Sequence, residues 1–298
     1  EDAALALEKR IPNDILDLPV GDQRYGFFTN PAGGIEYELM VSLWDDGIML
    51  VVNAACKEKD FSYLQEHLQG DAELSILEDR ALIALQGPRA RDVLNRLGLK
   101  LDDMGFMQCR EVEIQGIRCR MSRSGYTGED GFEISVRNEQ AETLARALQA
   151  DSDCAWIGLG ARDSLRLEGG MCLYGHDIDS TTTPVEAAIS WAIPPARRTG
   201  GIRAGGFVGA DVILPQMPAK VTRKRVGLKP LGRAPIREGT EIVDAQEQPI
   251  GTVTSGGFSP TLSQPIAMGY VNKINSKSGT QVYAKVRGKL LEIEVSSS

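Results

Sequence analysis

Cysteine and histidine are both scarce in this chain of 298 residues, which contains five cysteines and two histidines. The cysteines are scattered, and no two of them form a Cys-x-x-Cys pair. This pattern argues against a zinc site and is typical of proteins from reducing compartments. Two histidines cannot supply a histidine-based metal cluster, so we expect no bound metal.

Positive charge and long apolar runs are lacking as well. The formal net charge is -8, and phosphate binding requires a basic face, so we expect no nucleic-acid partner. The apolar runs are shorter than a membrane-spanning segment, and the first residues do not resemble a signal peptide. We therefore expect no membrane partner. Basic residues gather locally at 195–203 and 222–225, where solvated loop charge is the expected role.

The remaining composition, 42% hydrophobic and 25% charged, is ordinary for a globular protein. A chain of this length can bury two or three cores, so more than one domain is expected. In the first 190 residues, short apolar runs predict buried strands at 48–52 and 81–87, and alternation around Gln115-Gly116 predicts a hairpin. Helical spacing of apolar residues predicts helices at 57–70, 88–98, 138–150 and 159–170.

The composition changes near residue 193. Proline, glycine and arginine are frequent from there to about residue 224, which predicts a connection between domains. Short strands and turns follow, including 248–262 and 289–298, and they predict a small β-barrel or sandwich. The predicted domains are an α+β domain at 1–75, a second α+β domain at 76–205 and a β-barrel domain at 217–298.

The stretch SRSGYTGEDGFEIS, residues 122–135, joins a glycine-rich turn to the start of a strand. Gly125, Gly128 and Gly131 permit backbone conformations that are closed to other residues. Alternation after the turn places Glu133 on the strand face opposite Phe132. A carboxylate there is either a solvated surface group or a buried acceptor for an amide or amine.

Two further groups of polar side chains suit a pocket. Glu36 and Glu38 share one face of a strand, although acids on exposed strand faces are common. Arg162 and Arg166 have acidic neighbours at helical spacing, which favours surface ion pairs, unless one arginine clamps a planar or anionic group. Trp191 is either a core residue or a stacking wall. These patterns alone indicate a polar pocket between mixed domains.

Four strings, in this order, resemble one family: SRSGYTGEDGFEIS, LGARDSLRLEGGMCLYGHDID, TTTPVEAAISW and GTVTSGGFSPTL. The family is the T-protein, or aminomethyltransferase, of the glycine cleavage system. FFTNPAGGIEYELM and VVNAACKEKDF extend the resemblance toward the N-terminus, so that it covers nearly the whole chain. The resemblance implies an α+β fold, a multi-domain cloverleaf of mixed α/β sheet domains with a C-terminal all-β barrel-like domain.

The resemblance also implies an activity. Family members move the one-carbon unit from the aminomethyl-dihydrolipoyl arm of H-protein to tetrahydrofolate, with release of ammonia. Lipoylated H-protein and tetrahydrofolate are therefore the implied partner and acceptor, in the bacterial cytoplasm or the mitochondrial matrix. Carried over by position, Glu133 accepts hydrogen bonds from the pterin ring, and Arg162 lies near the folate tail or helps to fix the pocket. The implied lining residues are Tyr25, Met49, Val51, Tyr126 and Trp191.

Glu38 is the catalytic residue that the resemblance implies. The family pattern has an Asp-Asp pair after Gly-Gly-Ile, where this chain has Tyr37-Glu38. A glutamate keeps the charge but carries it on a longer arm. The chain is also shorter than the family pattern at both ends, so we expect a truncated member.

Related functions remain open at this stage. Three alternatives would bind folate in the same way. They are a folate-dependent demethylase, the folate half of a dimethylglycine or sarcosine dehydrogenase, and a non-enzymatic folate-binding module. The dehydrogenase is disfavoured because no dinucleotide fingerprint precedes the motifs. Folate-binding iron–sulfur assembly proteins carry a Lys-Gly-Cys-Tyr-x-Gly-Gln-Glu string, and the corresponding residues here, EGGMCLYGHDI, differ from it.

Overall fold

The computed structural model describes residues 2–218 and 220–297. The chain divides into two compact units, of which unit 1 is Glu1–Ala6, Ile15–Tyr25 and Leu39–Arg162, and unit 2 is Leu7–Asp14, Gly26–Glu38 and Asp163–Ser298. The three-domain division at 1–75, 76–205 and 217–298 stays a prediction. Residues 1, 219 and 298, which fall within the first and third of those ranges, lie outside the described part of the chain.

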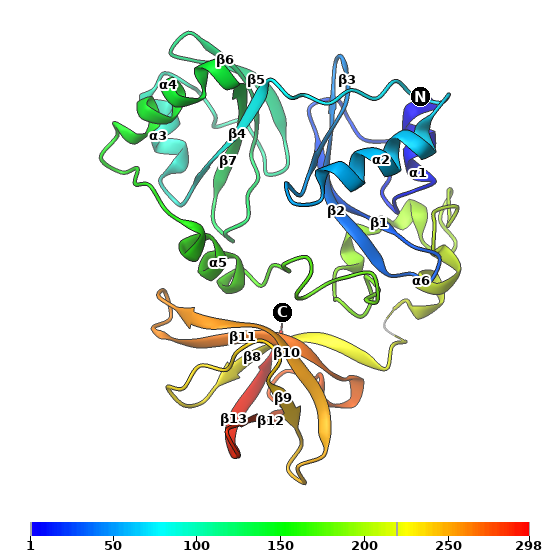
Figure 1. The fold of residues 1–298 in the computed structure, drawn as a ribbon. Coiled ribbons are helices and arrows are strands. Elements are labelled where there is room, and N and C mark those ends of the chain that lie inside the picture. Colours follow the sequence, from blue (N-terminus) through cyan, green and yellow to red (C-terminus); the bar gives the residue numbers. More distant parts are fainter. Residues whose placement is uncertain (1, 219, 298) are drawn as a thin grey trace. The chain divides into compact units, whose positions relative to one another are not determined.

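The first sheet has three strands in the order β1-β2-β3 (Figure 1). β1 (Gln23–Thr29) and β2 (Ile35–Trp44) contribute residues to both units, and β2 pairs antiparallel with β3 (Gly47–Val52). The predicted strand at 48–52 is confirmed, but its side chains are half-buried rather than buried. The helices of this region are α1 (Asp2–Glu8) and α2 (Lys57–Leu68), and Leu64 and Leu68 of α2 are buried as predicted.

The second sheet, wholly in unit 1, has four antiparallel strands in the order β4-β7-β6-β5. These are β4 (Arg80–Gln86), β5 (Cys109–Ile114), β6 (Ile117–Ser122) and β7 (Gly131–Arg137). Helices α3 (Ala90–Arg96) and α4 (Asn138–Gln149) pack on it (Figure 1). The predicted hairpin joins β5 to β6, and Gln115 (φ 49°) and Gly116 (φ 81°) are both left-handed, as in a two-residue turn whose twist matches its strands.

Strand β4 corrects one expectation. The run at 81–87 was expected to be buried, yet Leu82 is 46% exposed while Leu85 is only 7% exposed. The strand lies at the edge of its sheet, with Ala81 and Ile83 packed against the core. An apolar run does not by itself indicate that both faces of a strand are covered.

The segment expected to be a solvated connection is also folded. It contains η2 (Pro195–Arg197) and α6 (Ala210–Gln216), and it follows η1 (Ser190–Ala192). Arg197 is 4% exposed and donates to a Glu8 carboxylate oxygen at 2.6 Å. Arg225 is 3% exposed and donates to the Ala187 carbonyl oxygen at 2.8 Å. The prediction of solvated charge is therefore wrong for these two arginines.

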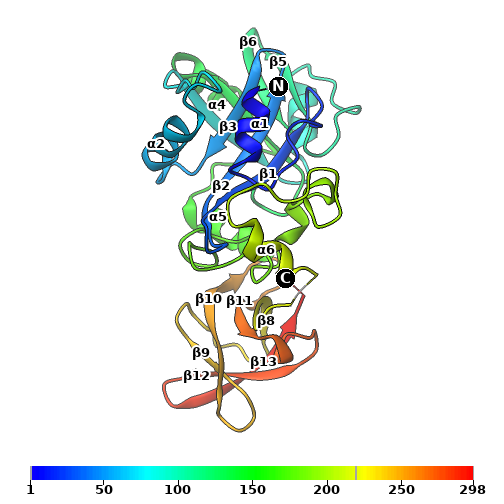
Figure 2. The same ribbon diagram turned by 90° about the vertical axis from the view of Figure 1, so that its right-hand side faces the viewer.

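The C-terminal part of unit 2 is a closed antiparallel barrel in the order β10-β11-β8-β13-β12-β9 (Figures 1 and 2). Its interior holds aliphatic side chains such as Val226, Ile242 and Ile293. The predicted fold class, mixed α/β sheets followed by an all-β barrel, is confirmed. The strands are β8 (Arg223–Pro230), β9 (Glu241–Val243), β10 (Pro249–Ser259), β11 (Gln264–Asn272), β12 (Gln281–Val286) and β13 (Lys289–Ser296), with η3 (Lys273–Asn275) after β11.

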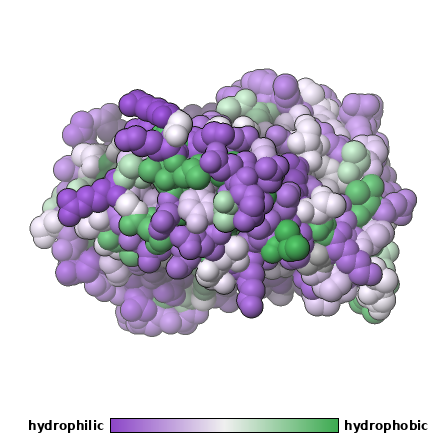
Figure 3. Space-filling model, turned by 90° about the horizontal axis from the view of Figure 1, so that it is seen from below, coloured by the Kyte–Doolittle hydropathy of each residue, from purple (hydrophilic) through white to green (hydrophobic). Residues whose placement is uncertain are grey.

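The surface seen from below is mostly hydrophilic, and its hydrophobic side chains form small, separate groups (Figure 3). Among the residues that the structure describes, no helix has both the length and the apolar character needed to cross a bilayer.

Candidate functional site

The glycine-rich turn of 122–135 is held together by polar contacts inside unit 1. Arg123 and Asp130 form a two-pronged ion pair, with N–O distances of 2.8 and 2.9 Å. The arginine lowers the pKa of Asp130, so this carboxyl stays charged. Gln86 of β4 donates to the Ser124 carbonyl oxygen at 3.0 Å and accepts from the Thr127 hydroxyl at 3.1 Å. These structural roles are not visible in the sequence, because the partners of Gln86 lie 38 and 41 residues away along the chain.

Glycine is required at the three positions of the turn for different structural reasons. Gly128 has a φ of 76°, in the left-handed region that favours glycine. Gly125 and Gly131 do not, but a Cβ atom at either would lie within 2.5 Å of the Gln86 side chain. The expected need for special backbone conformation therefore holds for Gly128, whereas Gly125 and Gly131 make room for Gln86.

Glu133 lies on β7 with its side chain on the face away from the core, as predicted. Its neighbours Phe132 and Ile134 are fully buried in the core of the second sheet, whereas Glu133 is half-buried. The Ser124 hydroxyl donates to one carboxylate oxygen of Glu133 at 3.1 Å, and the hydroxyls of Ser122 and Ser124 are 2.8 Å apart. The turn thus places a hydroxyl chain beside the carboxylate.

Three of the predicted folate-site residues, Met49, Val51 and Glu133, line one cavity in unit 1. The cavity has a volume of about 20 Å³, which is room for about one water molecule or one amino group. Leu82, 46% exposed, is a further lining residue, so the cavity reaches the surface of unit 1. Gln23 lines it as well. The result is a small polar recess with apolar walls and a carboxylate.

The recess also contains the Cys109 thiol, which is 6% exposed. Burial, with smaller contributions from the carboxylates of Asp22 and Glu133, raises the pKa of Cys109 to about 12. The thiol therefore stays neutral at physiological pH and acts as part of the wall rather than as a nucleophile.

Arg162 and Tyr126 form a second pair in unit 1. The guanidinium carbon of Arg162 lies 4.8 Å from the centroid of the Tyr126 ring, in cation–π geometry. Arg162 is exposed and Tyr126 half-buried. Tyr25, at the middle of β1, is also half-buried and is not among the residues that line the recess.

Glu38 and Trp191 belong to unit 2. Glu38 is half-buried on β2. Burial raises the pKa of Cys172 to about 12, and the charges of Asp177 and Glu38 contribute to the increase. The ring of Tyr37 lies 6.3 Å from that of Tyr174. Trp191 is 63% exposed, so it is not a core residue.

The turn before Glu38 is fixed by Asn30. Its amide nitrogen donates to Glu36 at 2.9 Å and to the Ser180 carbonyl oxygen at 2.8 Å. A Cβ atom on Gly34 would lie 1.8 Å from that same carbonyl oxygen, so only glycine fits. Glu36 is thus a structural acceptor.

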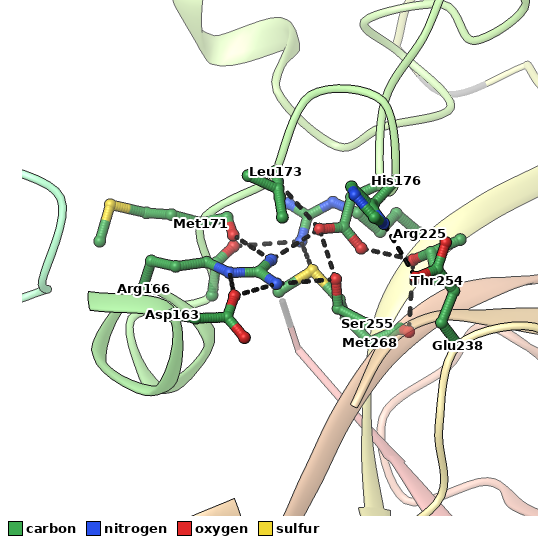
Figure 4. A network of polar contacts seen from close by, with 12 residues as sticks. Asp163, Arg166, Met171, Leu173, His176, Arg225, Glu238, Thr254, Ser255 and Met268 are labelled. Atoms are coloured by element: carbon green, nitrogen blue, oxygen red, sulfur yellow. Dashed lines mark hydrogen bonds and ion pairs between the residues drawn. The ribbon is translucent and has the colours of Figure 1, made fainter. Parts of the chain in front are cut away.

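Arg166 is the arginine that leaves the helix surface, but it clamps side chains of this protein. On α5 (Leu159–Glu168) it is 3% exposed and donates to Asp177 at 2.7 Å and to Ser255 at 2.9 Å (Figure 4). Ser255 and Thr254 of β10 donate to the two oxygens of Asp177, at 2.8 and 2.5 Å. These bonds join the motif after α5 to the barrel, so much of that motif is structural.

Cysteines and acidic groups give no sign of a metal centre in the described part of the chain. All five cysteines are free, and no group of three or more His, Cys, Asp or Glu is placed to hold an ion among residues 2–218 and 220–297.

Comparisons with known proteins show which family this chain resembles. The GCVT N-terminal domain family matches residues 1–196, and the glycine cleavage T-protein C-terminal barrel domain matches residues 223–298. The mitochondrial aminomethyltransferase of Solanum tuberosum is 46% identical over 95% of this chain and 71% of its own length. That of Dictyostelium discoideum is 42% identical over 99% and 77%. The crystal structure of the glycine cleavage system aminomethyltransferase T from Bartonella henselae has a TM-score of 0.91 at 41% identity, covering 100% of this chain and 81% of that one.

Proposed function

Since the chain belongs to the glycine cleavage T-protein family and is an aminomethyltransferase, we propose that tetrahydrofolate is its one-carbon acceptor and the aminomethylated lipoyl arm of H-protein its donor. The observation that carries this assignment is that Met49, Val51 and Glu133 line one recess. The demethylase and dehydrogenase alternatives have no observation of their own in their favour, and the binding-only alternative rests only on Glu38 standing where the family pattern has an aspartate.

The chemistry of the recess fits a pterin. A carboxylate accepts hydrogen bonds only, and the amino edge of a pterin offers N–H donors. Ser124 donates to one carboxylate oxygen of Glu133, and the carboxylate has a second oxygen with which to accept from the ligand. The side chains of Met49 and Val51 supply the apolar contact that a flat ring requires.

The remaining predicted residues have complementary roles. Arg162 is exposed and positively charged, which suits the carboxylate-bearing tail of a folate. Tyr126 and Tyr25 are half-buried aromatic walls, and the ring of Trp191 is 63% exposed, which suits stacking on a flat ligand.

Glu38 supplies the charge for the reaction. As ammonia leaves, positive charge develops on the transferred methylene, and a fixed carboxylate stabilises it. The rest of the task is to hold donor and acceptor in line, because positioning accounts for a large part of such a rate enhancement. The compartment proposed is the mitochondrial matrix in a eukaryote or the cytoplasm in a bacterium.

A tetrahydrofolate titration followed by tryptophan fluorescence tests the assignment. We expect saturable binding by the unmodified chain and at least a tenfold weaker affinity for Glu133→Ala, since a charged, half-buried acceptor is lost. Glu129→Ala is the matched control, because Glu129 lies on the same turn and is exposed. Equal affinity of the Glu133 and Glu129 variants would remove Glu133 from the folate site.

A further inference from the structure

Gln23 is a buried polar side chain whose amide oxygen has no partner. It is the first residue of β1, and it is 3% exposed. Its backbone N–H donates to the Met107 carbonyl oxygen at 2.8 Å, which fixes the start of the strand. The side-chain oxygen Oε1 is buried and accepts no hydrogen bond from the described residues. A buried acceptor left without a donor is costly, so such groups call for an explanation.

The oxygen belongs to a residue that lines the same recess as Glu133. The other polar groups of the recess are already engaged within the protein. Ser42 accepts from the Trp44 indole at 2.8 Å, and Ser135 accepts from Arg80 at 2.8 Å. The Ser122 hydroxyl lies 2.8 Å from that of Ser124, and the Arg120 guanidinium is ion-paired with Asp46 and Glu111. An amide oxygen can only accept hydrogen bonds, so the group that pairs with Gln23 Oε1 must be a donor. The recess of about 20 Å³ admits a single small group rather than a ring.

We propose that Gln23 is a specificity-determining residue whose Oε1 accepts a hydrogen bond from the exocyclic amino group of the pterin, beside Glu133. This inference rests on the proposed function, because it assigns the same recess to folate. The amino group fills the recess while the ring lies against Met49 and Val51. Two acceptors that line the same small recess select a ligand with donors at this edge, and a ligand without the amino group leaves Gln23 Oε1 unpaired.

The binding of two ligands to Gln23→Met and to a control variant tests the inference. The ligands are tetrahydrofolate and its 2-desamino analogue. Gln23→Met keeps the shape of the side chain and removes the acceptor. We expect Gln23→Met to weaken tetrahydrofolate binding about tenfold and to leave the affinity for the 2-desamino analogue unchanged. Ser42→Ala is the matched control, since that hydroxyl lines the recess but is paired within the protein, and it should affect both ligands alike.

Thermal unfolding supplies a second readout. Gln23→Met removes an unpaired buried oxygen, so its unfolding temperature should equal or exceed that of the unmodified chain. Equal weakening of both ligands would mean that Gln23 acts through the fold or through a bridging water, and would overturn the inference. If Gln23→Met binds tetrahydrofolate as tightly as the unmodified chain while Glu133→Ala still binds it more weakly, the inference about Gln23 is overturned and the proposed function is not. Absence of tetrahydrofolate binding by the unmodified chain overturns the proposed function together with it.

Discussion

Glu38 carries, on a longer arm, the charge that the family pattern assigns to an aspartate. Displacement of a catalytic group by about 1 Å can cost on the order of 100-fold in rate. We expect Glu38→Asp to raise kcat, by up to about tenfold, and Glu38→Gln to lower it by about 100-fold because the stabilising charge is lost. Steady-state turnover with aminomethylated H-protein measures both effects.

Glu36→Gln is the control for Glu38. Glu36 follows the same alternation on β2, but it accepts a hydrogen bond from Asn30, which a glutamine oxygen can also accept. Its turnover should stay close to that of the unmodified chain. Full activity of Glu38→Gln would exclude Glu38 as the catalytic carboxylate.

At the same scale, the sequence could indicate Glu133, because alternation from Phe132 fixes which face it occupies, and the structure places it there. It could not indicate Gln23 or Gln86. The partners of Gln86 and most of the residues that share a recess with Gln23 lie far away in the chain. Glutamine in a strand has no spacing pattern that distinguishes a buried acceptor from a surface residue.

Helix α2 contains a buried acid that should make stability depend on pH. Asp60 is 1% exposed, and neither of its carboxylate oxygens has a partner among the described residues. Burial raises the pKa of Asp60 from 3.8 to about 6. Between these two values the folded chain holds a proton that the unfolded chain releases, so stability falls as pH rises through this window.

The loss of folding free energy is complete above about pH 6, and a pKa raised from 3.8 to about 6 corresponds to a loss of about 3 kcal/mol. We expect Asp60→Asn to raise the free energy of unfolding by about 1 to 3 kcal/mol at pH 7.5 and to change it little at pH 4. Urea denaturation at both pH values measures this. Glu58→Gln, at an exposed position of the same turn, should show no such dependence, and an Asp60→Asn effect equal at both pH values would contradict the mechanism.

Elements with strong local signals were predictable. The Gln115-Gly116 turn and the spacing of Leu144 and Leu148 in α4 are decided by neighbours in sequence, and both are confirmed. Burial of β4 was not predictable, since it depends on what covers each face of the sheet. The folded character of 193–218 also depends on distant partners: Arg197 pairs with Glu8, 189 residues away.

At the scale of the whole molecule, the Asp177 network holds unit 2 together by joining α5 to strand β10 of the barrel. We expect Arg166→Ala to destabilise unit 2 by about 3 to 5 kcal/mol, because a carboxylate stays buried without its cation. Chemical denaturation, with a probe in the barrel, measures the loss.

Lys285→Ala is the control within the same unit. Lys285 and Glu247 form an exposed pair at 3.8 Å, and such pairs contribute about 1 kcal/mol or less. An Arg166→Ala effect no larger than that of Lys285→Ala would show that the network is not what stabilises unit 2.

A coupled turnover assay tests most directly whether Glu133 holds the folate acceptor of an aminomethyltransferase. With aminomethylated H-protein and tetrahydrofolate, the unmodified chain should release ammonia and form 5,10-methylenetetrahydrofolate in equal amounts. Glu133→Ala should raise the KM for tetrahydrofolate about tenfold or more and leave the KM for H-protein unchanged. An unchanged KM for tetrahydrofolate in Glu133→Ala would contradict the assignment of the recess to the pterin.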